Sequence, residues 1–427
     1  MRLLHTLALA LLLSPAAHAA FDVEALSSAV DAKVVEWRRD IHQHPELGNR
    51  EFRTSAKVAE HLRALGIEVR TGVAHTGVVG LLRGGRPGPK IALRADMDAL
   101  PVTEATGLPF ASTVTAEYNG QTTGVMHACG HDAHVAILMG VAEALASVRE
   151  ELPGEVLFLF QPAEEGPPPG ETGGAKQMLA EGVFDDFKPE AVFGLHVWAQ
   201  LPVGTIGFRG GPMMASADRW VLRVRGKQTH ASRPWGGVDP ITIAAQSLIA
   251  SQSIIARQID ITSSPVVLTA GAVRGGIRFN IIPETAEMEG TLRTFDMDVR
   301  ADVIARFERT AKAIAEAAGG EAELTVENTA PVTANELALT QRVRPWLREL
   351  MVEEKVKEMP LQTVAEDFSQ FANRAPGFLF FVGSTGPDIH PARAPNNHSP
   401  EFVLHEDALK HGTRAMLTLA FGVLEQR

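Results

Sequence analysis

A short stretch near residue 130 concentrates side chains that can bind a metal ion. It carries one thiol, three imidazoles and one carboxylate: His127, Cys129, His131, Asp132 and His134. A thiolate and an imidazole two residues apart can reach one metal ion when the backbone between them turns sharply, and Gly130 permits such a turn. Cys129 is the only cysteine of the chain, so it has no disulfide partner within it. The alternative is a half-buried cysteine beside solvated histidines, which this spacing alone leaves open.

Further potential ligands stand where apolar runs, typical of buried strands, come to an end. They are Asp96 and Asp98 after the first run, Glu164 and Glu165 after the second, and His196 at the end of the third. His398 follows much later, near the C-terminus. Open α/β sheets carry their ligands at such strand ends. One cysteine with several histidines and carboxylates therefore indicates a hydrolytic metal site.

The elements that must position these residues follow an alternating pattern. An alanine-rich helix is predicted over 133–146, directly after the cysteine cluster, and residues 23–66 predict two helices joined near 44–48. His42 and His44 lie in this first region, and we favour a structural or ligand-orienting role for them over a place in the metal set. Strands alternate with helices as far as Trp198, which is the pattern of a mostly parallel sheet.

The pattern changes from about Gly207. The sequence predicts strands over 215–226, 265–273, 284–294 and 321–327, and helices over 239–257 and 299–318. This β-α-β-β-α-β order predicts a four-stranded sheet with both helices on one face. We therefore interpret 208–328 as an inserted domain that interrupts a first domain of residues 20–207 and 329–427.

Several stretches together resemble one known family. They are residues 39–47, 93–101, 127–132, 161–165, 194–196, 227–232, 280–283 and 398–400, in that order. The chain resembles the M20 metallopeptidase and amidohydrolase family, in the branch of N-acyl-amino-acid hydrolases that includes hippurate hydrolases and auxin-conjugate hydrolases. The resemblance extends from about residue 30 to the end.

The resemblance implies an α/β fold and a division of roles. The first domain should have the phosphorylase/hydrolase-like architecture of zinc peptidases, and the inserted domain should be a ferredoxin-like α+β lid through which two chains form a homodimer. The implied metal ligands are Cys129, His131, Glu165, His196 and His398. Glu164 is the implied general base, and neighbouring residues at a strand end point in opposite directions, which suits this split. Asp96, Asp98 and Asp132 are expected to orient the histidines.

This many ligands would suit two divalent metal ions. Thiolate and imidazole favour zinc, whereas the carboxylates and the resemblance allow manganese, cobalt or nickel. The implied reaction cleaves the amide of an N-acyl amino acid with a metal-activated water. Two alternatives remain at this point: an exopeptidase of the same fold that acts on dipeptides, and a non-catalytic periplasmic binding protein.

The implied substrate carries a free carboxylate next to its amide. Arg293 and Asn280 are the candidates for holding that carboxylate, since a guanidinium fork suits it; the alternative for Arg293 is a surface ion pair. His230 is implied as a donor to the developing oxyanion, acting across a dimer. The alternative for His230 is a satisfied polar residue of a loop.

Other classes of protein fit the sequence poorly. The net charge is −11 without a basic stripe, which argues against nucleic-acid binding.

Residues 1–19 predict a signal peptide and hence export to the periplasm or the medium, with a retained membrane anchor as the alternative. No later apolar run is long enough to span a membrane. A Walker A motif and a Gly-x-Ser-x-Gly elbow are both absent. The proline-rich segment 166–174 predicts a stiff loop beside the site.

Overall fold

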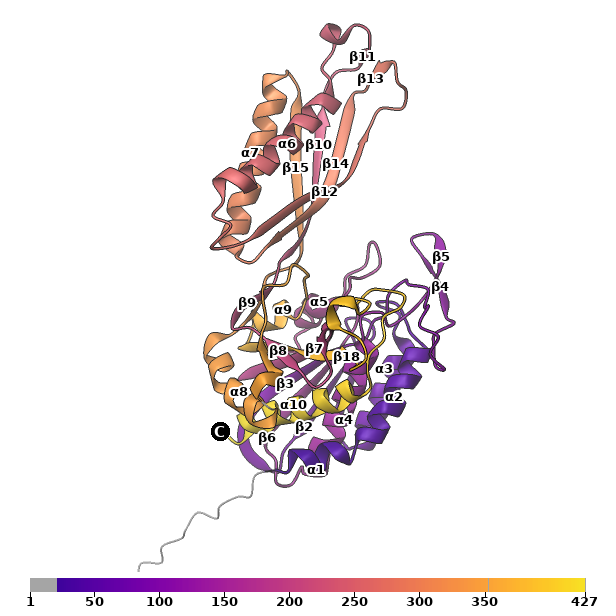
Figure 1. Cartoon of the computed structure of the whole chain (residues 1–427), viewed down its shortest axis with the longest axis vertical. Helices are drawn as coiled ribbons and strands as arrows, with labels where there is room; N and C mark the ends of the chain where they lie inside the picture. Colours follow the sequence, from indigo (N-terminus) through magenta and orange to yellow (C-terminus); the bar gives the residue numbers. More distant parts are fainter. Residues whose placement is uncertain (1–20, 352, 427) are drawn as a thin grey trace, which may run out of the picture.

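The computed structural model describes residues 21–351 and 353–426, so the predicted signal peptide lies outside the described residues. A mixed sheet runs through the larger part of the molecule (Figure 1). In spatial order its strands are β1 (Glu68–Val73), β2 (Gly77–Arg83), β6 (Pro153–Gln161), β3 (Arg86–Asp96), β7 (Ala191–Pro202), β18 (Gly377–Thr385), β8 (Ile206–Phe208) and β17 (Val356–Glu358). The four central strands, β6, β3, β7 and β18, pair in parallel. This sheet confirms the predicted α/β class.

Helices cover both faces of the sheet. One face packs against α1 (Val23–Ser28), α2 (Asp31–Gln43), α3 (Phe52–Ala64), α4 (His131–Ser147), α8 (Leu337–Leu350) and α10 (Asp407–Leu424). The other face packs against α5 (Gly174–Ala180) and α9 (Ser369–Ala372). Strands that are covered on both faces are apolar along their whole length, which explains the continuous apolar runs in the sequence.

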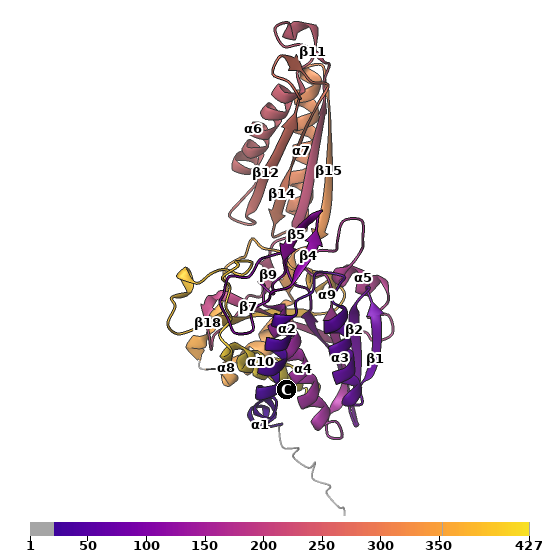
Figure 2. The ribbon, with the colours of Figure 1, turned by 90° about the vertical axis from the view of Figure 1, so that its right-hand side faces the viewer.

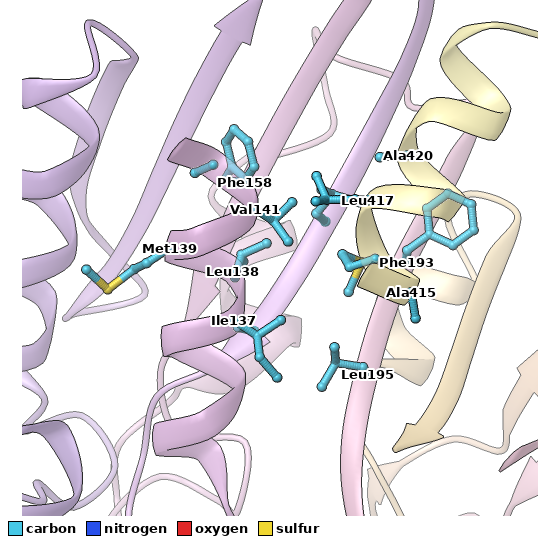
Figure 3. Packing of buried hydrophobic residues seen from close by; sticks show 14 of the residues in the cluster. Ile137, Leu138, Met139, Val141, Phe158, Phe193, Leu195, Ala415, Leu417 and Ala420 are labelled. Atoms are coloured by element: carbon cyan, nitrogen blue, oxygen red, sulfur yellow. The ribbon is translucent and has the colours of Figure 1, made fainter. Parts of the chain in front are cut away.

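Helix α4 lies at the centre of the larger core. Its side chains Ile137, Leu138 and Val141 are buried among residues of the central strands and α10, as Figure 3 shows. Burial of one such side chain stabilises the fold by about 1.5–3 kcal/mol. A Cβ added at Gly140 would lie 2.5 Å from Val34 Cγ2, so α2 approaches α4 closely there. The helix that carries His131 is therefore held rigidly.

The N-terminal region contains three helices, whereas the sequence predicted two. The first break falls between α1 and α2, where the Val30 amide donates to the Ser27 carbonyl at 3.0 Å. This bond spans three residues and tightens the last turn of α1. The second break, between α2 and α3, falls at the predicted turn.

A separate lobe projects from one end of the larger domain (Figures 1 and 2). Its antiparallel sheet has the order β12 (Val266–Gly275), β14 (Thr285–Thr294), β10 (Ala217–Arg225) and β15 (Glu321–Ala330). Helices α6 (Pro240–Gln258) and α7 (Met297–Ala317) pack on one face, around a core that contains Trp220, Met288 and Phe307. The predicted ferredoxin-like α+β arrangement is thus confirmed.

The lobe joins the larger domain through two chain segments. Before β10, β9 (Gly211–Met214) pairs with β16 (Thr333–Asn335), which follows β15, so the entry and the exit lie side by side. The lobe sheet spans 217–330, and the domain bounds of 208–328 stay a prediction. At the far end, β11 (Thr229–His230) and β13 (Ile281–Ile282) form a small ribbon beside the short helix η1 (Pro234–Gly236).

The remaining elements are short. They are the hairpin β4 (Thr115–Tyr118) and β5 (Gln121–Gly124) and the 3-10 helices η2 (Glu353–Lys355) and η3 (Pro391–Arg393). Among residues 21–351 and 353–426, no helix has the length and apolar character needed to span a bilayer.

Candidate metal centre and active site

The five predicted metal ligands come together in space although they span 270 positions of the chain. Among the described residues, five groups have all their ligand atoms within 4.8 Å of one another, and three overlapping groups contain two or more of the predicted ligands. They are Cys129 with His131 and His196, Cys129 with Glu165 and His398, and His131 with Glu164 and Glu165. The cluster lies where β6 and β3 end and α4 begins, and it includes His196 from within β7. This is the strand-end location expected from the sequence.

Gly130 shapes the link between Cys129 and His131, as predicted. Its φ of +96° lies in the left-handed region, and a Cβ there would lie 2.3 Å from Val197 Cγ2. Glycine alone fits both conditions. The turn leads directly into α4. Cys129 lies just before the N-cap residue Gly130, and His131 is the first residue of the helix.

His196 presents one ring nitrogen to the cluster. Its Nδ1 lies 2.7 Å from the Val197 carbonyl oxygen and donates a hydrogen bond to it, which leaves Nε2 as the nitrogen with a free lone pair. That Nε2 lies 3.3 Å from the Cys129 Sγ. A histidine that ligates a metal usually donates its other N–H to such an oxygen. The strand β7 continues past His196 to Pro202, further than the sequence suggested.

His398 reaches the cluster from a loop that docks on Cys129. The side-chain Nδ2 of Asn397 donates to the carbonyl oxygens of Cys129 at 3.0 Å and Val197 at 3.1 Å, and the backbone amide of His398 donates to the Ala128 carbonyl oxygen at 2.8 Å. His398 has a φ of +71°, and its Nε2 lies 2.9 Å from Glu165 Oε1. Because 53% of its side chain is exposed, His398 marks the open side of the site.

Asp98 links His131 to the two adjacent glutamates. One of its oxygens lies 3.3 Å from His131 Nδ1 and also accepts from the Glu164 amide, and the other accepts from the Glu165 amide, both at 3.0 Å. The orienting role of Asp98 stays a prediction, to which these contacts lend support. Asp98 thereby sets the positions of an imidazole and of the backbone that carries both glutamates.

Asp96 holds a different histidine from the one that joins the ligands. Its Oδ1 lies 2.5 Å from His134 Nδ1, and His134 Nε2 accepts from the Val197 amide at 2.9 Å. Both ring nitrogens of His134 are thus occupied, so His134 is a structural link between β3 and β7. His131 Nε2 lies 3.7 Å from Asp96 Oδ2, beyond hydrogen-bond distance.

The side chains of Glu164 and Glu165 diverge. Glu165 contacts His398, whereas Glu164 Oε2 lies 3.9 Å from His131 Nε2 and its Oε1 accepts from the Asp367 amide at 3.4 Å. The sequence attributed this divergence to a strand end. In the structure β6 ends at Gln161, and the pair lies on the turn that follows.

The charged groups of the cluster would be stabilised by a bound cation. Burial raises the pKa of Glu164, and Glu366 and Glu165 raise it further. Burial also raises the pKa of the Cys129 thiol, together with both glutamates. Burial lowers the pKa of His131, but Asp96 and Asp98 outweigh it and raise that pKa to about 10. Sulfur, nitrogen and oxygen donors around a buried excess of negative charge fit a divalent metal ion.

Sequence reasoning missed a buried ionic network behind Asp96. The fully buried Arg94 donates to Asp96 at 2.7 Å and to Glu366 at 2.8 Å, and also contacts Gln161 and Asp367. A charged residue inside an apolar strand was a usable signal, since arginine is seldom fully buried unless it is paired. Glu366 and Asp367 carried no comparable signal, because they lie in an irregular segment more than 200 positions away.

Comparison with known proteins identifies the family. Residues 92–421 match the sequence pattern of Peptidase family M20/M25/M40. The chain belongs to this family. A solved structure from Bacillus subtilis, described as a dinuclear metal-binding peptidase of the M20 family, has a TM-score of 0.78 and 34% identity, covering 94% of this chain and 99% of that one. The predicted family and fold class are therefore confirmed.

Named relatives include both peptidases and amidohydrolases. Thermostable carboxypeptidase 2 of Saccharolobus solfataricus is 41% identical over 91% of this chain and 94% of its own length. An N-acetyl-L-cysteine deacetylase of Bacillus subtilis is 37% identical over 90% and 86%. An IAA-amino acid hydrolase of Arabidopsis thaliana is 35% identical over 94% and 88%. This M20 protein is a metal-dependent amidohydrolase, as the sequence predicted.

Asp132 does not orient a metal ligand in this M20 enzyme, contrary to the expectation. Its Oδ2 lies 2.8 Å from both Arg38 Nε and His42 Nδ1, and His42 also contacts Glu104. Burial raises the pKa of Asp132, but Arg38 and His42 outweigh it and hold that pKa well below its usual range. Asp132 therefore ties α4 to α2. His42 has the structural role that we favoured, and His44 is exposed.

Asp132→Ala is expected to destabilise the fold by about 3–5 kcal/mol, because the buried Arg38 would lose its partner at 2.8 Å and be left with Glu406 at 4.0 Å. Urea unfolding followed by circular dichroism measures this loss. The matched control is Asp40→Ala, which removes a half-exposed carboxylate paired with Arg53 and Lys57 and is expected to cost about 0–1 kcal/mol. Equal losses in the two variants would contradict the role of the Asp132 network.

The predicted site residues in the lobe of this M20 enzyme lie at its two opposite ends. His230 is exposed on the tip ribbon, and the neighbouring Ala231 amide donates to the Asn280 carbonyl oxygen at 3.1 Å. Arg293 lies at the other end of β14, next to Thr294, whose carbonyl oxygen accepts from the amide of Ser216 at the entry to the lobe. The strand separates the two ends by about 25 Å. Asn280 and Arg293 of one chain therefore cannot hold the same carboxylate.

Proposed function

We propose that this protein hydrolyses the amide bond of N-acyl amino acids, with Glu164 as general base. The observation that carries the proposal is the Glu164 carboxylate, only 9% exposed, which lies beside the ligand cluster while Glu165 contacts His398. The names of the deacetylase and of the IAA-amino acid hydrolase support this substrate class. Both names describe an acyl group attached to an amino acid.

Two divalent ions would be held by Cys129, His131, Glu165, His196 and His398. When bound, they would polarise the amide carbonyl and lower the pKa of water. Glu164 accepts a proton from the attacking water and passes it to the leaving nitrogen. The soft thiolate and the imidazoles favour zinc, and the carboxylates also suit manganese, cobalt or nickel.

The lobe of a second chain would complete the site. The tip around His230 and Asn280 exposes three large apolar side chains, Trp235 at 82%, Ile277 at 100% and Phe279 at 91%. Exposed apolar patches of this kind mark interaction surfaces. In this proposal, His230 and Asn280 come from the partner, while Arg293 comes from the same chain as the metal ligands. In this arrangement, Asn280 of one chain and Arg293 of the other meet at one site, although β14 keeps the two residues of a single chain apart.

A carboxypeptidase activity is the second candidate, favoured by the names of the relatives at 41% identity. An N-acyl amino acid and the C-terminal residue of a peptide present the same amide next to a free carboxylate. The two substrates differ only on the acyl side of the bond.

The deciding experiment is a substrate panel. The purified chain is stripped of metal, reloaded with zinc, manganese, cobalt or nickel, and assayed with acetyl and benzoyl amino acids against dipeptides and longer peptides. A higher kcat/KM for the N-acyl amino acids supports the proposal. A higher kcat/KM for peptides with every metal would replace it with the carboxypeptidase.

Cys129→Ser is expected to lower metal content and activity together, because a serine hydroxyl binds a soft divalent metal far more weakly than a thiolate. Elemental analysis of the purified variant measures metal per chain independently of turnover. His44→Ala is the matched control, since His44 is exposed and lies outside the ligand groups. Full metal occupancy with normal turnover in Cys129→Ser would remove Cys129 from the ligand set.

We also propose export, with residues 1–19 removed as a signal peptide. The early arginine, the short apolar run and the Ala17-His18-Ala19 segment support it. Expression of the full chain in a bacterial host, followed by N-terminal sequencing of the periplasmic fraction, tests this proposal. A cytoplasmic product that retains its first residues would contradict it.

A further inference from the structure

The turn that carries both glutamates is held by two buried carboxylates. Three consecutive amides, those of Ala163, Glu164 and Glu165, each donate to a carboxylate oxygen. The last two donate to Asp98, as described above. The first donates to Glu51 Oε1 at 2.9 Å. Successive amides that point to one side form a natural binding site for carboxylate oxygens.

Glu51 reaches this turn from a distant part of the chain. It stands at the start of α3, but its side chain makes no capping hydrogen bond to that helix. One of its oxygens accepts from Ala163, and the other accepts from the Thr76 hydroxyl. Its side chain is completely buried. Both oxygens thus have a partner outside α3.

The turn has no room to rearrange freely. Ala163 has a φ of +48°, a left-handed conformation that alanine seldom adopts. A Cβ at Gly48 would lie 3.1 Å from the Ala163 Cβ, and one at Gly173 would lie 3.2 Å from it. The orientation of the Ala163 amide therefore decides how the following two side chains leave the turn.

We propose that Glu51 is a positioning residue for Glu164 and Glu165, which it directs by accepting the Ala163 amide and so holding the left-handed turn. This inference rests on the proposed roles of Glu164 as base and Glu165 as ligand. Glu51 touches no candidate ligand in the described contacts, and it acts only through the backbone.

The required property of Glu51 is an acceptor at the correct reach, not a negative charge. Burial raises its pKa to about 8, with a further contribution from Asp98. A carboxamide of the same length offers an oxygen to the Ala163 amide and an NH2 group to the Thr76 oxygen. An aspartate keeps the carboxylate but is one methylene too short to reach Ala163.

The test compares Glu51→Gln with Glu51→Asp in the metal-loaded full chain, using the best substrate of the panel. Glu51→Gln is expected to keep kcat within about threefold, whereas Glu51→Asp loses roughly ten- to hundredfold in kcat, since a displacement of about 1 Å at reacting groups can cost that much. Hydrogen exchange of peptides that cover 160–166 gives a second readout. Exchange should accelerate in Glu51→Asp and stay unchanged in Glu51→Gln.

Glu46→Ala is the matched control for a merely structural effect. Glu46 lies in the same segment and accepts from the Arg53 amide at 2.8 Å and the Thr54 amide at 2.9 Å, so it caps α3. Its loss should lower the Tm and leave kcat unchanged. The inference would be overturned by a wild-type kcat in Glu51→Asp. It would also be overturned if Glu51→Gln or Glu46→Ala lost as much kcat as Glu51→Asp.

Glu164→Gln, assayed in parallel, separates this inference from the proposed function. If Glu164→Gln is inactive and Glu51→Asp is normal, the positioning role fails and the proposed function stands. If Glu164→Gln keeps its turnover, the proposed role of Glu164 as general base fails, and the positioning role that rests on it fails with it. Faster exchange at 160–166 in Glu51→Asp would then show only that Glu51 holds the turn.

Discussion

Glu164→Gln is expected to retain its bound metal and to lose roughly a thousandfold in kcat, the middle of the range for a lost general base. A carboxamide cannot accept the proton of the attacking water. The metal should stay, because Glu165 rather than Glu164 lies against His398, at 2.9 Å. In the part of the chain that the structure describes, the Glu164 carboxylate has longer contacts, at 3.9 Å to His131 Nε2 and 3.4 Å to the Asp367 amide.

Elemental analysis and steady-state kinetics on the same preparation measure both quantities. Glu165→Gln is the matched variant one position away, and it should lose metal as well as activity. If Glu164→Gln loses the metal and Glu165→Gln keeps it, the roles of the two glutamates are exchanged. Near-normal turnover of metal-loaded Glu164→Gln would remove the general base from the mechanism.

His230→Ala is expected to keep the fold and the metal and to lose roughly a hundredfold or more in kcat, as for a single oxyanion donor. His230 Nδ1 accepts hydrogen bonds from the Ser232 amide at 3.1 Å and from the Ser232 hydroxyl at 2.8 Å. The ring proton therefore sits on Nε2, which is left to donate to an oxygen on the substrate. Steady-state kinetics with the metal content determined in parallel measures this loss, and near-normal turnover would exclude His230 from the reaction.

Mixing two inactive variants tests whether His230 acts across a dimer. A mixed dimer of His230→Ala and Glu164→Gln has one site with both wild-type residues, so some activity should return. A mixture of Cys129→Ser with Glu164→Gln is the control, because both changes lie in the larger domain and neither site is restored. Absence of rescue, with mixed dimers shown to form, would confine His230 to its own chain or remove the cross-subunit contact.

Much of this enzyme was determined by local sequence. Strands and helices followed their apolar periodicity, because a strand that is buried on both faces and a helix that is buried on one must show it in the sequence. Gly130 marked a turn that only glycine can make beside Val197. The candidate metal ligands were identifiable because thiols, imidazoles and carboxylates gathered at strand ends have few structural uses.

Tertiary structure decided which of several similar side chains lies in the candidate metal site and which makes a structural contact instead. Three histidines lie within eight positions near α4, yet His131 lies among the candidate ligands, whereas both ring nitrogens of His134 contact Asp96 and the Val197 amide. Asp132, next to His131, turns to Arg38 instead. These choices depend on partners from α2, β3 and β7, whose positions no local pattern contains.

Long-range pairing and strand direction were likewise beyond the sequence. Arg94 meets Glu366, and Glu51 meets Ala163, across 272 and 112 positions, because the sheet order brings those segments together. Asn280 and Arg293 are only 13 positions apart, yet an extended strand places them at opposite ends of the lobe. Separation along the chain sets neither contact nor distance, since the backbone between two residues can fold back or run straight.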